Sequence, residues 1–498
     1  MEGFLTSKGC ETPTAKGSPV DTVTQTAFLS KPEVKCVLEA VKNAVRRVLP
    51  HGKFAEREAA ALAILEEAGR GLLERELQEI ADGFGERLLI AGVEYKKHAP
   101  GAAQYYCLGG TLHVARDTYR PVGVHNGPTV VPLDLVAGLA EGATPALAYN
   151  VVHGYAQHDM RLHGEALLAA HRTPPPRATL ERMAKRLATA SHEVAPRIEA
   201  ILRQAEALPD GACAICIGLD RTSVPMAEER PAGASEKPRK KRRKPRMRRA
   251  PKPIDVNFRM AYVGTVSIVN EHGEAIITRR YAAPACDDPA PLVARMMADV
   301  RAAVRRQPSL NVGIVQDGAP EMWNLVRDGL ARLRDEGIVA SWEEGIDRYH
   351  LLERLGNALE IIEPDAAARS QKLHEWNDRL DLKDTAIDGI ERELAKRCVE
   401  LSDAKQNAVM EHLVYIENNK DRMRYVTLST NGLPIGSGVT ESAAKTVVGR
   451  RAKNSGQRWS EPGLRGVLTL RAIHQSDRLP RFWNHLSRRY TAAVAEAA

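Results

Sequence analysis

The sequence predicts a mixed α/β core that is interrupted by an α-helical insertion and preceded by a mainly helical region. Two apolar runs, 212–220 (ACAICIGLD) and 311–319 (NVGIVQDGA), have the composition of buried strands. Two further strand-like segments, 256–270 and 273–283, follow the first run and meet at a short polar turn. Segments with helical periodicity separate and follow these strands. Strands that alternate with helices in this way form a sheet covered by helices.

The N-terminal part of the chain is predicted to be mainly helical. Residues 1–30 are polar and lack periodicity, which predicts a disordered tail. Helical periodicity runs through 31–82 and again through 131–205. Between these stretches, residues 103–122 alternate as a short hairpin does, with two glycines at its turn. We therefore treat residues 31–205 as one N-terminal region.

Two helical segments of this region, 163–171 and 178–191, surround the break RTPPPR. One interpretation is a helix-turn-helix that reads DNA, which would make residues 31–205 a DNA-binding region. The other is a helical hairpin with a basic side in solvent, and the residues alone leave both open. The exposed basic side would contain Arg182, Lys185 and Arg186.

The C-terminal half of the chain contains the predicted core in two parts. Residues 206–364 hold the strands and the helices between them, and they end in a weak strand that runs into a helix. Residues 365–428 are charged and strongly helical, which indicates a helical insertion. Residues 429–498 begin with a Gly-Ser-Gly turn and continue as helices, and we expect them to complete the core.

Positive charge is concentrated in one tract. The formal net charge is +8, whereas residues 237–252 (KPRKKRRKPRMRRAPK) alone contain 11 Lys or Arg and no acid. A tract of this kind suits a polyanion, and we expect a loop that binds DNA phosphates without reading sequence. A nuclear-localisation-like signal and a plain disordered linker are the alternatives. The side chains expected on DNA are those of Lys240, Lys241, Arg242 and Arg243.

Several protein classes are disfavoured by composition. Seven cysteines with scattered spacing do not make a secreted disulfide framework. The first residues lack a signal-peptide pattern, and no run of about 18 apolar residues would span a membrane. A cytoplasmic protein is therefore expected. Cys213 and Cys216 fall within a predicted buried strand, so we interpret them as core residues rather than as a metal or redox pair.

Two acids stand at the ends of predicted strands. Asp220 ends the first apolar run and Asp317 follows the second. Ligands of open α/β sheets bind beyond the strand ends. If the intervening hairpin lies to one side, these two strands become neighbours and both carboxylates project into one crevice. Paired carboxylates repel each other unless a cation neutralises them, and Mg²⁺ prefers oxygen ligands.

Glu441 is the best candidate for a third acid. It falls in the first turn of a predicted helix that Ser437 could cap. Each acid also has an ordinary explanation taken singly, since Asp is common in turns and Glu favours helix N-termini. Together the three acids could hold two metal ions about 4 Å apart. Cations suited to phosphate follow on the same segment: Lys445, Arg450, Arg451, Lys453 and Arg458.

More than half of the chain resembles the DDE transposases of bacterial insertion sequences, in particular the ISKra-type group. The resemblance implies an RNase-H-like catalytic core with a helical insertion. It also implies that Asp220, Asp317 and Glu441 hold two Mg²⁺ ions, for which Mn²⁺ may substitute. The matching stretches are IGLDRTSVPM, VGTVSIVNEHGE, ITRRYAA, VGIVQDGAPEMWNLV, IDRYHLLERLGNAL and GSGVTESAAKTVVGRRAKNSGQRWSEPGLRGVLTLRA.

The resemblance also implies the partners and the activity. Such enzymes bind the terminal inverted repeats of a mobile element, cut there and join the ends to target DNA. They work as homo-oligomers because two ends must be held together, and they associate with the nucleoid. Asp347 and His350 match a D-x-x-H motif of related transposases, which implies that the histidine contacts the scissile phosphate or the cleaved end. A structural Asp–His pair at a helix start is the alternative.

Two features depart from the family pattern. Arg221 stands where glycine usually follows the first aspartate, and the basic tract is an unusually long loop. These departures leave open a catalytically inactive, transposase-derived DNA-binding protein. A nuclease that cuts without joining is a third possibility. Trp459 could stack on a base near the transposon end, but core packing is the preferred interpretation.

Overall fold

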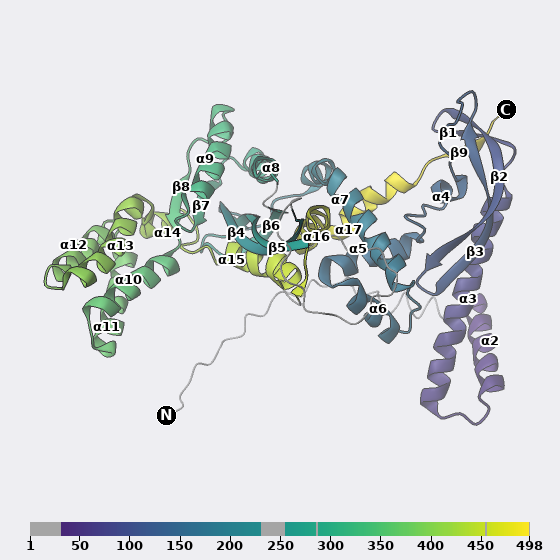
Figure 1. Ribbon diagram of the computed structural model, residues 1–498, viewed down its shortest axis with the longest axis horizontal. Helices are drawn as coiled ribbons and strands as arrows, with labels where there is room; N and C mark the ends of the chain where they lie inside the picture. Colours follow the sequence, from purple (N-terminus) through teal and green to yellow (C-terminus); the bar gives the residue numbers. More distant parts are fainter. Residues whose placement is uncertain (1–30, 231–253, 285–286, 454–455, 498) are drawn as a thin grey trace.

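The computed structural model describes residues 31–230, 254–284, 287–453 and 456–497. Figure 1 shows an elongated molecule whose central sheet lies between a block of helices at one end and an N-terminal unit at the other. The predicted tail 1–30 lies outside the described residues. So does the basic tract 237–252, with Lys240, Lys241, Arg242 and Arg243.

The central sheet has five strands: β4 (Ala214–Glu229), β5 (Ile254–Val269), β6 (Ala275–Pro284), β7 (Asn311–Gln316) and β8 (Glu343–Ile346). Their order is β6-β5-β4-β7-β8. β4, β5 and β6 pair antiparallel, whereas β7 joins β4 in parallel and β8 joins β7 in parallel. The predicted mixed α/β core is confirmed. The first and fourth predicted strands, β4 and β7, are neighbours as expected.

β4 is longer than the sequence predicted. We expected the strand to end at Asp220, but it continues to Glu229 because β5 pairs with it along its whole length. Only the parallel neighbour stops earlier, since the last β4–β7 pair is Ile217 with Ile314. Asp220 therefore lies beyond the last pair between β4 and β7, in a part of β4 that pairs only with β5.

Two helices cover the sheet, and glycines allow the first helix to approach both β5 and the second helix. Helix α8 (Ala290–Arg306) buries the apolar face that its period of three to four residues predicts. It approaches β5 closely, because a Cβ on Gly264 would stand 2.3 Å from the sulfur of Met296. Helix α9 (Pro320–Asp335) follows β7 and contacts α8 at Gly329, where a Cβ would lie 2.8 Å from Cγ of Met297.

A block of helices extends from the far end of the sheet (Figure 1). It begins with α10 (Arg348–Ile362), directly after β8. Its centre is apolar although its sequence is highly charged, and Trp376 and Leu380 are buried there. The block continues with α11 (Ala366–Leu382), α12 (Ala386–Cys398), α13 (Asp403–Asn419), a 3₁₀ turn (Lys420–Arg422) and α14 (Tyr425–Thr430).

The chain then returns to the sheet through short and longer helices. α15 (Gly438–Ala443) passes directly into a π-helical segment, Ala444–Lys453. α16 (Glu461–Gln475) packs against β6, and α17 (Leu479–Leu486) against the N-terminal helix α7 (Arg177–Ala205).

The N-terminal region contains more strand than predicted. Its strands β1 (Arg87–Ile90), β2 (Val93–Cys107) and β3 (Gly110–Pro121) form an antiparallel sheet. The expected hairpin is present, but β2 begins earlier than expected. The fourth strand of this sheet is β9 (Val494–Glu496), which pairs with β1 from the other end of the chain. The helices are α2 (Pro32–Val48), α3 (Phe54–Asp82), α4 (Pro132–Val136), α5 (Pro145–Gln157), α6 (Met160–Ala169) and α7.

The two predicted segments around the RTPPPR break are α6 and α7. α7 is a 29-residue helix with an interior proline, and it packs along α16. Arg182, Lys185 and Arg186 are exposed on α7, and Arg186 pairs with Glu141 at 2.8 Å. The packing is compatible with both interpretations of this helix pair. Among the described residues, no helix is long and apolar enough to cross a membrane.

Candidate active site

Asp220 lies in β4, Asp317 directly follows the neighbouring strand β7, and both line the same cavity of about 600 Å³. Each carboxylate is half-buried and uses one oxygen locally. Oδ1 of Asp220 accepts the N–H of Arg221 at 2.6 Å, and Oδ1 of Asp317 accepts the N–H of Ala319 at 3.1 Å. The turn-capping role that an aspartate after a strand commonly has is therefore real for Asp317. It leaves Oδ2 without a protein donor among the described residues.

Glu441 reaches this cavity because α15 lies unusually close to the sheet. A Cβ on Gly218 would stand 2.0 Å from Oγ1 of Thr440, so only glycine leaves room for the helix here. The hydroxyls of Thr440 and Thr265 are 2.7 Å apart and fix the contact. Glu441 is the next residue, and it lines the cavity together with Asp220 and Asp317. The structure thus brings the three predicted acids to one place.

Asp347 holds the two helices that carry His350 and Glu441. It is the N-cap residue of α10, and its Oδ1 accepts the N–H groups of Tyr349 and His350 at 2.7 and 3.3 Å. Its Oδ2 accepts both the N–H and the hydroxyl of Ser437 at 2.5 Å. Ser437 precedes α15 but does not cap it with its side chain, contrary to our expectation. Its hydroxyl is already donated to Asp347.

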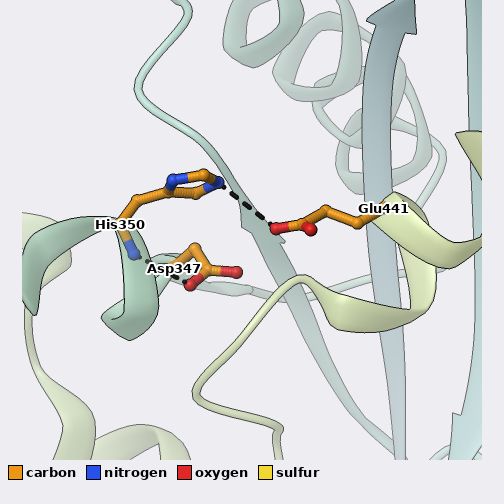
Figure 2. Close-up of side chains that lie close together, drawn as sticks. All are labelled: Asp347, His350 and Glu441. Atoms are coloured by element: carbon orange, nitrogen blue, oxygen red, sulfur yellow. Dashed lines mark hydrogen bonds and ion pairs between the residues drawn. The ribbon is translucent and has the colours of Figure 1, made fainter. Parts of the chain in front are cut away.

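His350 points at Glu441 (Figure 2), and both residues line the cavity. Its Nε2 is 3.3 Å from Oε1 of Glu441, while its Nδ1 is 3.6 Å from Glu353. The second oxygen of Glu441 is 3.3 Å from Nζ of Lys445. Glu441 therefore stands between two groups that can carry positive charge.

A second set of potential metal ligands, different from the predicted Asp220, Asp317 and Glu441, lies close together. Ligand atoms of Asp347, His350 and Glu441 all lie within 4.8 Å of one another. However, Asp347 is only 1% exposed, and both of its oxygens already accept hydrogen bonds from protein groups. We therefore regard Asp347 as the group that positions its neighbours, and not as a ligand.

The remaining carboxylates fit a divalent cation. Burial raises the pKa of Asp220, the Arg221 N–H partly offsets this, and the negative charges of Asp317 and Glu441 raise the pKa further. Such repulsion is relieved when a cation binds between carboxylates. Three carboxylates offer oxygen ligands, which suit Mg²⁺ and also Mn²⁺. Asp220, Asp317 and Glu441 are thus chemically suited to the predicted metal site.

The same cavity has a cationic wall. Lys445, Arg450 and Lys453 line it, and all three are exposed. The π-helical segment has wider turns than an α-helix. This widening helps to keep Glu441, Lys445 and Lys453, which lie multiples of four residues apart, on one side. Lys453 also donates to Oγ1 of Thr222 on β4, which ties the segment to the sheet beside Asp220.

Two residues of this part of the chain that were predicted to contact DNA, Arg451 and Arg458, do not line the cavity. Arg451 is 5% exposed, and its guanidinium lies over the rings of Tyr155 and Trp459 at 5.5 and 4.9 Å from their centres. It also donates to Gln457 at 2.6 Å, so it is a packing residue and not part of the cationic wall. Arg458 is exposed but does not line the cavity.

Trp459 belongs to the core. It is 8% exposed, and its Nε1 donates to the carbonyl of Ala452 at 3.1 Å. Its backbone pairs with β4 at Met226, on the stretch that β7 does not reach. Core packing, rather than base stacking, accounts for this residue.

Gln316 is a further cavity residue, which we did not predict from the sequence. It is 1% exposed, and its Oε1 accepts the N–H of Leu219 at 3.2 Å, just past the last β4–β7 pair. The side chain thus accepts a backbone N–H of β4 where β7 no longer pairs with that strand, beside both Asp220 and Asp317. Its Nε2 has no hydrogen-bond partner among the described residues. A polar residue inside the apolar run VGIVQD was the signal that could have indicated it.

Arg221, which stands where the family pattern has glycine, is directed away from the cavity. Its guanidinium pairs with Glu321 on α9 at 2.5 Å, and Glu321 also accepts the hydroxyl of Tyr262 at 3.0 Å. Arg221 is not among the residues that line the cavity. This departure from the family pattern therefore leaves the three acids unobstructed.

Of the two cysteines interpreted as core residues, Cys216 is partly buried against the core, whereas Cys213 directly precedes β4 and lies outside the core cluster. Burial raises the pKa of the Cys216 thiol to about 12. Cys213 packs near Gly432, where a Cβ would lie 2.8 Å from its sulfur. Both thiols are free, and residues three apart on a strand face opposite sides. They therefore do not form a joint metal site.

Comparison with known proteins adds little to this geometry. No family model matches the sequence. No curated protein matches it either. Among solved structures, the chain is similar to the Drosophila P element transposase strand transfer complex, with 11% identity and a TM-score of 0.23. The alignment covers 70% of this chain and 83% of that one. At that level of similarity, the residues of the cavity alone carry the functional inference.

Proposed function

We propose that the chain is a DDE-type DNA transposase. In this proposal Asp220, Asp317 and Glu441 hold two Mg²⁺ ions, with Mn²⁺ as a substitute. One observation carries the proposal: carboxylates from β4, from the end of β7 and from α15 line one cavity together with a cationic wall. The motifs that resemble insertion-sequence transposases support it.

The proposed reaction is phosphodiester cleavage followed by strand joining. Metal ions at such a site supply Lewis-acid activation of a hydroxyl and neutralise charge on the phosphate. Lys445, Arg450 and Lys453 bind the phosphates that flank the scissile bond and orient the strand. Gln316 links β4 to β7 beside the acids, through its hydrogen bond from the N–H of Leu219. Water and the freed 3′-hydroxyl serve as nucleophiles, so no covalent link between enzyme and DNA is required.

His350 has two roles in this proposal. In the structure Nε2 of its imidazole lies 3.3 Å from Oε1 of Glu441, and this contact orients the carboxylate. With DNA bound, the same imidazole contacts the scissile phosphate. A ring held by the N-terminus of α10 through Asp347 is well oriented for both.

DNA binding is proposed to extend beyond the cavity. The double-stranded partners are the terminal inverted repeats of a mobile element and its target DNA. The basic tract with Lys240, Lys241, Arg242 and Arg243 would add contacts to phosphate that weaken as salt rises. The N-terminal region, with Arg182, Lys185 and Arg186 on α7, is the candidate for reading the repeats.

The test is a strand-transfer assay. A supercoiled plasmid that carries the gene's own flanking DNA is incubated with the purified chain and Mg²⁺. Asp317→Asn and Glu441→Gln are compared with Asp328→Asn, an exposed acid of α9 outside the cavity. We expect cleaved and joined products from wild type and Asp328→Asn only.

Other outcomes select other functions. Strand breaks without joined products would indicate a nuclease. Salt-sensitive binding without breaks, in Mg²⁺ and in Mn²⁺, would indicate a catalytically inactive DNA-binding protein derived from a transposase.

A further inference from the structure

Helices α2 and α3 form a hairpin that projects from the N-terminal sheet (Figure 1). The second half of α3 is fastened to β3. There Arg70 donates to the carbonyl of Thr111 at 3.1 Å, and Glu74 accepts the N–H of His113 at 2.9 Å. The first half of α3 packs on α2.

The outer part of this hairpin lacks a core of its own. Among residues 32 and 34–73, whose burial the structure describes, Val45 is the only buried residue. Two helices in contact cannot surround an apolar centre, so most of their apolar side chains remain in water. Helical stability in proteins comes mainly from packing of the apolar face. The hairpin is therefore incomplete as a packing unit.

The exposed apolar residues are ordered, not scattered. α3 presents a leucine face, which we define as Leu62, Leu65, Leu72 and Leu73, with exposed fractions of 38, 47, 53 and 42%. Leu62, Leu65, Gly69 and Leu72 follow one another at spacings of three and four residues, the repeat by which helices pair with other helices. On α2, Val37 and Val48 are exposed by 56 and 67%.

Gly69, in the middle of the leucine face, points to a missing neighbour. A Cβ at this position would meet nothing within 4 Å, so the fold of one chain does not require glycine there. Glycine in a helix interior costs about 1 kcal/mol relative to alanine. Close approach of another backbone is an ordinary reason to keep one.

The charges of the two helices indicate what this neighbour is. The sequence of α2 contains four basic and two acidic residues, whereas that of α3 contains eight acidic and three basic residues. A basic helix with an apolar edge fits the leucine face of an acidic helix. One hairpin offers both surfaces, so two copies satisfy each other around a two-fold axis.

We propose that this hairpin joins two copies of the chain. α2 of each copy lies against the leucine face of α3 of the other, and the four helices form a bundle with a shared apolar centre. The inference is independent of the proposed function, because it rests on the hairpin alone and needs neither DNA nor metal.

The test measures mass in solution. The full chain, without DNA, is examined by light scattering coupled to gel filtration and by sedimentation equilibrium. We expect a dimer of the 54.6-kDa chain. Leu65→Glu combined with Leu72→Glu should raise the dimer dissociation constant on the order of 100-fold, because charges would enter the shared apolar centre.

The control adds the same charge to a different side of the same helix. Ala59 and Ala63 are exposed on α3 and lie outside the leucine face. Ala59→Glu combined with Ala63→Glu should leave the dimer intact, and circular dichroism should show equal helix content in all three proteins. A monomeric wild type would overturn the proposal. So would a dimer that tolerates the leucine substitutions, or one that the control disrupts to the same extent.

Discussion

A single oxygen of Asp347 accepts two hydrogen bonds from Ser437, one from its backbone N–H and one from its hydroxyl, both at 2.5 Å. The other oxygen of Asp347 caps α10. One buried carboxylate therefore joins the start of α10, which carries His350, to the start of α15, which carries Glu441. Asp347 and Ser437 are 90 residues apart in the chain. The distance between His350 and Glu441 depends on this link.

Asp347→Asn should damage both the fold and the site. An amide can accept with only one atom, so at least one buried donor at Ser437 or α10 would lose its acceptor. We expect a loss of about 1–3 kcal/mol in the free energy of unfolding, measured with urea. Ser437→Ala removes only the hydroxyl and should cost less, about 1 kcal/mol. Equal losses in the two variants would mean that the backbone contact contributes little.

Gly218→Ala tests the close approach that brings Glu441 to the cavity. The new methyl would overlap Oγ1 of Thr440, so α15 must move away from the sheet. Strand cleavage should fall by about 100-fold, since displacements of about 1 Å have such effects on reacting groups. Adding Thr440→Ala removes the overlapping atom and should restore part of the activity. If the double variant is no better than the single one, the contact is not what places Glu441.

The sequence alone predicted those parts of the site that a pattern within one short segment indicates. Apolar runs that end in acids are local, and they placed Asp220 and Asp317 on neighbouring strands. Glu441 was indicated by its position in a helix start. The glycine at 218 and the partner of Ser437 are not local, because each depends on a surface brought in from a distant part of the chain.

The errors have equally specific causes. β9 is three residues long and pairs with β1 from the opposite end of the chain, so no local pattern could reveal it. β4 continues past Asp220 because its antiparallel partner does, which the apolar run does not show. Arg451 was grouped with the cations around it, but the direction of its side chain depends on the π-helical turn and on a pocket of aromatic rings.

Lys453 and Arg451 should differ in a measurable way. Lys453→Gln removes a cation from the cavity wall, so DNA binding should weaken and the slope of log affinity against log salt should fall by about 1. Arg451→Gln removes a buried packing group, so it should lower thermal stability and leave the slope unchanged. Titration of fluorescent DNA at several salt concentrations distinguishes the two. A reduced slope for Arg451→Gln would contradict its assignment.

Acid should destabilise the protein partly through His163. Burial and the nearby His158 and His153 lower its pKa from 6.5 to about 4, while its Nε2 contacts Asn150 at 3.0 Å. Because the folded pKa lies below the unfolded one, the stability is present above about pH 6.5 and is lost as pH falls towards 4. The full contribution is up to about 3 kcal/mol.

His163→Gln keeps a neutral donor for Asn150 and removes the titrating ring. Its free energy of unfolding should therefore fall less than that of wild type between about pH 6.5 and 4. His171→Gln, at an exposed position, serves as the control and should follow wild type. Identical acid sensitivity in His163→Gln and wild type would assign the effect to other groups.

Metal binding should appear as a change in stability even without DNA. Asp220 is half-buried, and burial together with the negative charges of Asp317 and Glu441 raises its pKa, so the ionised carboxylate is unfavourable in the metal-free site. Mg²⁺ should raise the melting temperature of wild type, and at 100 times its dissociation constant the gain is about 2.7 kcal/mol. Asp220→Asn relieves the repulsion, so in chelator it should be at least as stable as wild type. It should respond little to Mg²⁺, whereas Asp328→Asn should respond as wild type does. If Asp220→Asn gains as much from Mg²⁺ as wild type, the ion binds elsewhere.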